Sequence, residues 1–165
     1  MGHTAGDNAM NSGKWPVAVC SWSLQSDVAG VAAAIRQLGI DRVNLALKPA
    51  FRDDGEAYLD AVRRQNWTFS ATTIGFAQED YSTLESIRAT GGILPDESWP
   101  ENRRIVVRAA EITAELEVRY LTMHAGFIES DDPARARRLR DRLLSLADEA
   151  GGRGIFLLMG TGQET

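Results

Sequence analysis

The sequence contains one cysteine, Cys20, and no apolar stretch of the roughly 18 residues that a membrane-spanning helix requires. A single cysteine excludes an intrachain disulfide and any metal site made of several cysteines. Chains without disulfides suit a reducing compartment, so we expect a cytoplasmic protein. Because the sequence has no apolar stretch long enough to span a membrane, we also expect no membrane partner. Residues 1–14 are polar and lack the apolar segment of a signal peptide. They are interpreted as a flexible leader before a domain over residues 15–165.

Lysine is scarce as well, with Lys14 and Lys48 as the only two, and the net charge is -5. This charge argues against nucleic acid as a partner, because nucleic-acid surfaces are usually basic. One stretch is rich in arginine and invites the opposite interpretation. It comprises Arg135, Arg137, Arg138, Arg140 and Arg142. A helical period spreads these side chains around one helix beside Asp132 and Asp141, so we interpret them as a solvated helix surface.

From residue 15 onward, short apolar runs rich in β-branched and aromatic residues alternate with segments of helical period. The runs cover residues 17–22, 42–47, 67–74, 119–124 and 155–159. After the first run, a helix is predicted that Ser26 or Asp27 begins and Gly39 ends. Its buried stripe is expected at Val28, Val31, Ala32, Ile35 and Leu38.

Helix signals also fill the later connections. A short helix over 58–62 follows the second run, and another is predicted over 82–89 in the long connection after Gly75. A capping box at 98–101 then opens a longer helix, and a last helix is expected to begin at Asp132 and to end before Gly151. The buried stripes of these last two helices are expected at Ile105, Ala109, Ile112 and Leu116, and at Ala136, Leu139, Leu143 and Ala147.

Alternating strands and helices predict an α/β fold with parallel strands joined by right-handed crossovers. Two architectures satisfy the pattern: a five-stranded doubly wound flavodoxin-like sheet, and a partial (β/α)8 TIM barrel of about four βα units plus a fifth strand. Periodicity does not separate them. The sequence has no glycine-rich phosphate loop, and its first run ends at 21–23 in Ser-Trp-Ser rather than in carboxylates, so nucleotide-binding and response-regulator folds have no local support.

Two segments carry a resemblance to a known family. Residues 120–128, YLTMHAGFI, and residues 155–165, IFLLMGTGQET, resemble the xylose isomerase-like TIM-barrel superfamily, in its sugar phosphate isomerase and epimerase branch. The resemblance begins near Val17 and implies the N-terminal portion of a TIM barrel. It also implies metal-assisted proton transfer next to a sugar carbonyl, a sugar or sugar phosphate as ligand, and a divalent metal (Mn, Mg or Zn) in complete family members.

The sequence departs from this family at Gly160, where family members carry a metal-binding glutamate. Glycine offers no side chain to a cation, so we assign no metal ligand and no cofactor to this chain as it stands. The expected protein is therefore a truncated isomerase or epimerase that is weakly active or inactive. The alternative is a non-catalytic half barrel that acts only by binding a partner or ligand.

Three residues are the candidates for a site. His124 ends the fourth run, at the end of a strand where TIM-barrel sites form, and is the predicted catalytic residue. Trp22 and Glu164 are predicted to contact substrate, as the wall of a sugar pocket and as a residue of the fifth loop. Lys48 is weighed as a phosphate or imine residue and is interpreted as a solvated lysine. A partial barrel has unpaired strand edges, so self-association is expected.

Overall fold

The computed structural model describes residues 10–128 and 132–160, and Glu164 therefore lies outside the described residues. The chain divides into two compact units, residues 1–70 and residues 71–165, and each is described by itself. The strand β5 (Thr68–Thr73) crosses this division.

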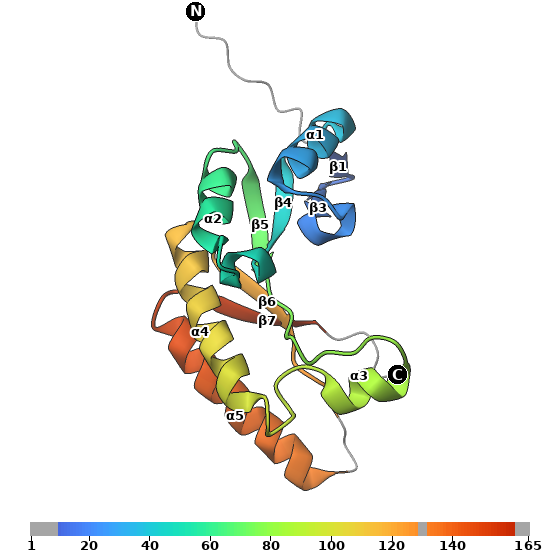
Figure 1. Cartoon of the computed structure of the whole chain (residues 1–165), viewed down its shortest axis with the longest axis vertical. Coiled ribbons are helices and arrows are strands. Elements are labelled where there is room, and N and C mark those ends of the chain that lie inside the picture. The colour runs from blue at the N-terminus through green and yellow to red at the C-terminus, as the bar shows by residue number, and fades with distance from the viewer. Residues whose placement is uncertain (1–9, 129–131, 161–165) are drawn as a thin grey trace, which may run out of the picture. The chain divides into compact units, whose positions relative to one another are not determined.

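Unit 1 contains a parallel strand pair and two α-helices (Figure 1). Val19 of one strand pairs with Val43 of the next, and a short antiparallel hairpin that turns at Gly13 precedes them. The strands are β1 (Asn11–Ser12), β2 (Trp15–Pro16), β3 (Ala18–Cys20) and β4 (Arg42–Ala46). The helices are η1 (Ser21–Leu24), α1 (Val28–Leu38), η2 (Lys48–Phe51) and α2 (Gly55–Arg63).

Helix α1 has the ends that its sequence predicts. The Asp27 carboxylate accepts a hydrogen bond from the Gly30 amide at 2.8 Å, and Gly39 ends the helix with φ +67°. Val31, Ala32 and Ile35 are buried, but Leu38 in the last turn is exposed, so the predicted stripe is wrong at its final position.

Unit 2 places two long helices against parallel strands (Figure 1). Leu121 and Met123 of β6 (Tyr120–His124) are buried on the helical side, and β7 (Phe156–Gly160) pairs with β6 so that His124 lies opposite Gly160. The helices are α3 (Leu84–Thr90), α4 (Trp99–Glu115) and α5 (Pro133–Gly151). They bury Val106, Ala109, Ala110 and Ile112 of α4, and Leu139, Leu146 and Ala150 of α5.

Several predicted details of unit 2 are wrong. Helix α3 begins at Leu84, because Thr83 rather than Ser82 accepts a capping bond from the Ser86 amide. Ser98 makes no side-chain capping bond to α4. The buried stripe of α5 passes through Leu146, and Ala147, which was expected inside, is exposed.

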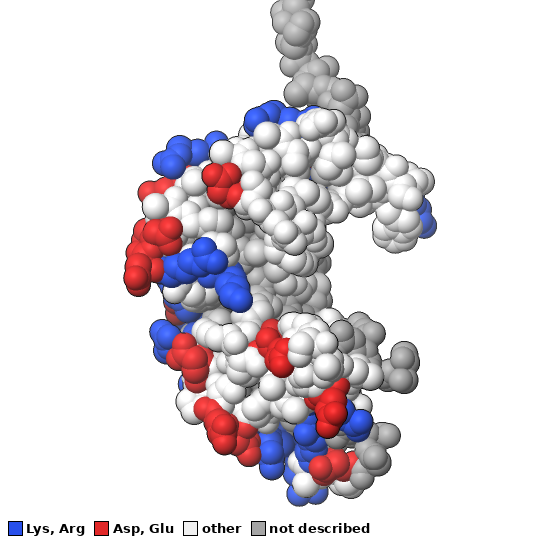
Figure 2. Space-filling model, turned by 45° about the vertical axis from the view of Figure 1, so that its right-hand side comes forward, with Lys and Arg blue, Asp and Glu red and all other residues white. Residues whose placement is uncertain are grey.

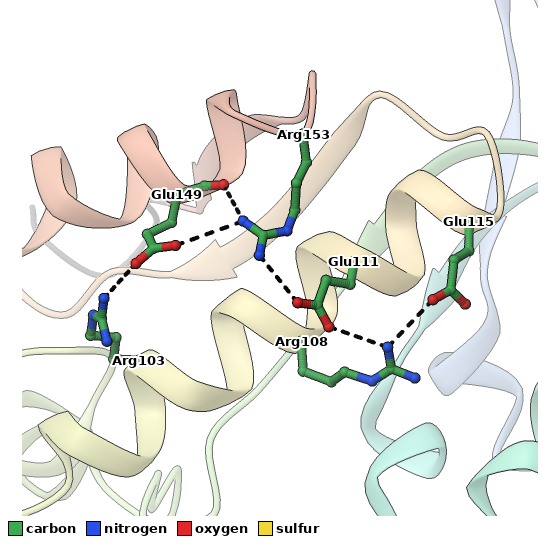
Figure 3. Close-up of polar contacts among 6 residues, drawn as sticks. All are labelled: Arg103, Arg108, Glu111, Glu115, Glu149 and Arg153. Carbon is green, nitrogen blue, oxygen red and sulfur yellow. Dashed lines mark hydrogen bonds and ion pairs between the residues drawn. The ribbon is translucent and has the colours of Figure 1, made fainter.

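A network of ion pairs joins α4 to α5 (Figure 3). Arg153 contacts Glu111 of α4 and Glu149 of α5, and Arg103 reaches Glu149 as well. Hydrogen bonds from Arg108 and Arg153 hold the pKa of Glu111 below its usual range. These side chains are partly exposed, so each pair stabilises the fold only slightly. Figure 2 shows acidic and basic groups interleaved over this unit rather than gathered into a basic patch.

The strand order decides the fold class. The parallel sheet has the order β3-β4-β5-β6-β7, which follows the chain. In a flavodoxin-like sheet the second and third strands lie on opposite sides of the first, so the spatial order differs from the order in the chain. In a (β/α)8 barrel the strands follow the chain order, and right-handed crossovers place every helix on one face of the sheet. The predicted partial TIM barrel is therefore confirmed and the flavodoxin-like alternative is wrong. No helix among the described residues is long and apolar enough to cross a membrane.

Candidate functional site

His124 lies at the carboxyl end of β6, with its side chain on the face opposite to the buried Leu121 and Met123. Its neighbour across the sheet is Gly160 of β7. Parallel strands of TIM barrels present their catalytic groups at this end, because the loops that follow the strands meet there. His124 is therefore positioned as its sequence predicts.

The nearest charged partner of His124 is Glu79, from the loop that follows β5. Glu79 Oε1 lies 3.6 Å from His124 Nδ1, and the two side chains are only 3% and 16% exposed. The carboxylate is held by backbone donors: the Phe76 amide donates to Oε2 at 2.9 Å and the Gly92 amide donates to Oε1 at 3.1 Å. A buried carboxylate bound in this way has a fixed orientation and favours an Nδ1–H on the imidazole.

Two glycines bring the next segment of chain against this pair. A Cβ on Gly91 would lie 2.9 Å from His124 Cε1, so only glycine allows the backbone to pack on the imidazole. Gly92 has φ +66°, and its carbonyl accepts hydrogen bonds from the side chains of Gln78 at 2.9 Å and Asn102 at 3.0 Å. The loop of residues 91–94 is thereby fixed to the site.

Aromatic rings flank the histidine. The Phe127 ring lies edge-on at 6.2 Å and the Tyr81 ring lies at 6.5 Å between centroids. Burial, followed by the charge of Glu79 and a hydrogen bond to it, raises the pKa of the Tyr81 phenol, which therefore stays protonated at neutral pH. Because Nδ1 is buried, the solvent-accessible part of the imidazole lies away from Glu79.

Arg142 of α5 fixes the loop of residues 91–94 from the other side. Its guanidinium donates to the carbonyls of Ile93 and Leu94, both at 2.7 Å, pairs with Asp96 and lies 4.9 Å from the Trp99 ring centroid. The side chain is 11% exposed. The prediction that all five arginines of this helix are solvated is therefore wrong for Arg142.

Arg142→Lys is expected to lower the free energy of unfolding by about 1–2 kcal/mol, because an ammonium group cannot donate to both carbonyls and stack on Trp99 as the guanidinium does. Urea denaturation measures the loss. Arg140→Lys is the matched control: Arg140 lies on the same helix, is exposed and pairs only with Asp141 among the described residues. Equal stability of the two variants would contradict the role assigned to Arg142.

Trp22 belongs to unit 1, in η1, directly after β3. Its side chain is 47% exposed and lines a pocket of about 200 Å³ between η1 and η2. Two side chains form the floor by binding the end of β4: Ser21 Oγ accepts from the Ala46 amide at 2.9 Å, and the Tyr58 hydroxyl donates to the Ala46 carbonyl at 2.6 Å. Trp22 therefore lines a pocket, and its contact with a substrate stays a prediction.

Tyr58→Phe is expected to lower the free energy of unfolding by about 1 kcal/mol near neutral pH, because the hydrogen bond to Ala46 is lost. Burial raises the pKa of the Tyr58 phenol from 10 to about 12. The stabilisation from protonated Tyr58 is therefore complete below pH 10 and is lost as the pH rises through 12. Urea curves of wild type and Tyr58→Phe should converge over this window, whereas Tyr120→Phe, which removes an exposed hydroxyl, should parallel wild type throughout.

The described residues do not fit a divalent-cation site. Both Glu79 oxygens already accept backbone hydrogen bonds, and Gly160, opposite His124, has no side chain. Residues 10–128 and 132–160 contain no group of three or more histidine, cysteine or acidic side chains that could hold a metal ion.

The sequence singles out His124 and Trp22 as candidates, which stay predictions, and it does not single out Glu79, Tyr81 or the glycine pair. The available signal was position: Glu79 is the first carboxylate after the third strand, and two adjacent glycines interrupt the long connection that follows. His124 and Trp22 lie in different units, and each is described within its own.

The strand order defines the class of fold: it is that of a partial (β/α)8 TIM barrel. Among solved structures, the chain is similar to a xylose isomerase domain protein from Planctomyces limnophilus, with TM-score 0.74 and 19% identity over 92% of this chain and 55% of that one. It is also similar to a xylose isomerase-like TIM-barrel protein from Mycobacterium smegmatis in complex with magnesium, with TM-score 0.58, 14% identity and coverage of 90% and 55%.

A D-allulose 3-epimerase from a Methylomonas species, solved with D-allulose, matches with TM-score 0.57, 17% identity and coverage of 86% and 49%. The chain thus spans about half the length of these proteins. The resemblance predicted from residues 120–128 and 155–165 is confirmed at the level of the fold. No protein-family model and no curated protein sequence matches the chain.

Proposed function

We propose that residues 15–165 are the N-terminal portion of a sugar isomerase or epimerase, in which His124 and Glu79 assist proton transfer next to the carbonyl of a sugar or sugar phosphate. The observation that carries this proposal is the buried Glu79 carboxylate, 3.6 Å from Nδ1 of a histidine at the carboxyl end of β6. It is supported by the shared fold of an L-ribulose 3-epimerase and of a D-psicose 3-epimerase solved with D-fructose.

The chemistry follows from the orientation of the imidazole. The Glu79 carboxylate, 3.6 Å from Nδ1, electrostatically favours the tautomer with its proton on Nδ1, and Nε2 is then the atom that exchanges a proton with the ligand. When a base removes the proton from the carbon beside the carbonyl, the electron pair of that bond moves to the carbonyl oxygen. A protonated Nε2 donates its proton to this oxygen and recovers one when the carbonyl forms again. The base that takes the carbon-bound proton is not assigned to a described residue.

We expect this chain to be weakly active or inactive by itself, because the described residues offer no complete set of metal ligands. A cytoplasmic location is part of the same proposal. The magnesium of the Mycobacterium smegmatis relative suggests that the complete site holds a divalent cation. The second candidate is a non-catalytic half barrel that only binds a partner or ligand. The glycine opposite His124 favours this alternative.

Histidine NMR tests the proposal, because the chain has two histidines and His3→Gln leaves only His124. The ¹³C signals of the His124 ring should shift on titration with D-fructose, D-allulose or D-fructose 6-phosphate, and should not shift with sorbitol, which lacks a carbonyl. Glu79→Gln should weaken the response. No shift at about 10 mM sugar, ten times the upper range of usual KM values, would reject the proposal.

Solvent exchange separates the two candidates. In D2O, an isomerase or epimerase replaces the sugar hydrogen beside the carbonyl by deuterium, and mass spectrometry detects the added mass. Exchange that His124→Gln abolishes supports catalysis. Binding without exchange supports the half barrel that only binds.

Self-association is expected from the face of the sheet opposite to α4 and α5. Tyr120, Phe156 and Leu158 are exposed there, and the rings of Tyr120 and Phe156 lie 6.0 Å apart. Light scattering should show dimers or larger species, and Leu158→Lys should shift the protein towards monomer by at least tenfold in dissociation constant. Leu144→Lys is the control, because Leu144 is also an exposed leucine but lies on α5. A monomeric wild type at high concentration would contradict this expectation.

A further inference from the structure

We propose that the pocket between η1 and η2 of unit 1 binds the phosphate group of a phosphorylated sugar through Lys48 and Arg52, with Trp22 against the sugar. This inference narrows the ligand class of the proposed function and rests on that function for the sugar part. The anion site itself rests on the pocket alone.

The charge of the pocket carries the inference. Its lining contains Lys48 and Arg52 and no carboxylate. Neither cation has an ion-pair partner among the described residues, although arginines of unit 2 such as Arg103 and Arg153 are paired with glutamates. Two nearby positive charges without counter-ions favour a dianionic ligand over a neutral one.

Acidic groups do occur beside the pocket, on the adjoining hollow that Arg52 also lines. They are Asp27 and Asp54. The Asp27 carboxylate accepts the Gly30 amide at the start of α1, so it is already engaged. Asp54 forms no ion pair with Arg52 within the described residues. The positive character of the smaller pocket is therefore not cancelled.

The backbone that carries both cations is firmly held. Lys48 begins η2 immediately after β4, and the end of β4 is bound on both sides by Ser21 and Tyr58 through Ala46. The Arg52 amide donates to the Pro49 carbonyl at 3.2 Å and closes the turn. The attachment points of both side chains are therefore fixed, which lowers the part of the ordering cost that the backbone would add when an anion binds.

Aromatic side chains supply the remaining wall. Trp22 and Trp67 both line the pocket, and its volume of about 200 Å³ holds a single small ligand. Sugar C–H groups pack against indole faces, so a phosphate on Lys48 and Arg52 would place the attached sugar beside Trp22. A phosphorylated sugar would contact both the two cations and Trp22, whereas free phosphate would contact only the two cations.

The test uses the scarcity of lysine. With ¹³Cε-lysine incorporated, the full chain gives signals from Lys14 and Lys48 only, and Lys14→Arg assigns them. Lys14 lies over Trp15, outside the pocket, and serves as the internal control. Titration with inorganic phosphate should shift Lys48 and not Lys14. D-fructose 6-phosphate should bind at least tenfold more tightly than phosphate, and D-fructose should not shift Lys48.

Arg52→Gln should raise the dissociation constant for phosphate about tenfold, and Trp22→Ala should reduce the preference for D-fructose 6-phosphate while leaving the phosphate affinity unchanged. Equal shifts of Lys14 and Lys48, or an unchanged affinity in Arg52→Gln, would overturn the inference. A Lys48 response without any response of the His124 ring would retain the anion site and reject the proposed function. A shift of the His124 ring signals without a shift of Lys48 would support the proposed function and reject the anion site.

Discussion

Alanine in place of Gly92 is expected to lower the free energy of unfolding by more than about 3 kcal/mol and to separate the loop of residues 91–94 from His124. An added Cβ would lie 2.2 Å from the carbonyl carbon of Ala125 and from the amide nitrogen of Gly126. These are backbone atoms, which cannot rotate away, so the loop or the end of β6 must move. Chemical denaturation measures the loss. Faster hydrogen exchange at the Ile93 amide, which donates to the Ala125 carbonyl, reports the displacement.

Gly39→Ala separates the cost of the left-handed backbone from the cost of the steric clash. Gly39 has φ +67°, nearly the same as Gly92, but an added Cβ would meet no atom within 4 Å. Its substitution should therefore show only the cost of the left-handed backbone, about 1 kcal/mol. If Gly92→Ala lowers the free energy of unfolding no more than Gly39→Ala does, the close approach between the loop of residues 91–94 and the end of β6 is not rigid.

Removal of the Glu79 carboxylate is expected to cause the second large loss, about 2–5 kcal/mol for Glu79→Ala. The amides of Phe76 and Gly92 would lose their acceptors in a region that excludes water, and each buried unpaired donor costs about 1–3 kcal/mol. Glu79→Gln keeps the shape but exchanges one acceptor oxygen for a donor. It should therefore fall between wild type and Glu79→Ala.

The control for Glu79 is Glu97→Gln, an exposed glutamate in the same long connection, for which we expect a change within about 0.5 kcal/mol. The ring signals of His124 provide a second readout, and they should move in both Glu79 variants and remain in place in Glu97→Gln. Wild-type stability of Glu79→Gln would show that the two amides do not depend on the carboxylate.

The sequence was a good guide wherever structure is local. The run at 42–47 becomes β4, the runs at 119–124 and 155–159 become β6 and β7 within one residue, and Asp27 with Gly39 bounds α1. These features depend on alternation and on capping groups within a few residues of one another.

The site depends on contacts that no local period records. Glu79 lies in the loop after β5 and His124 ends β6, so the two meet only after β5 and β6 have paired. Arg142 shows the same limit: its position in an arginine-rich helix predicts a solvated side chain, yet its guanidinium turns to the carbonyls of Ile93 and Leu94. A charged side chain can be largely buried when backbone carbonyls accept its hydrogen bonds.

The pairing of Gly160 with His124 has a practical consequence. Among the described residues, the atom nearest to a Cβ at position 160 would be the Met123 carbonyl oxygen, at 3.6 Å, and the backbone there is not left-handed. Side chains of directly paired residues project from the same surface of a sheet. Gly160→Glu would thus place a second carboxylate, besides Glu79, on the surface of the sheet that carries the His124 imidazole.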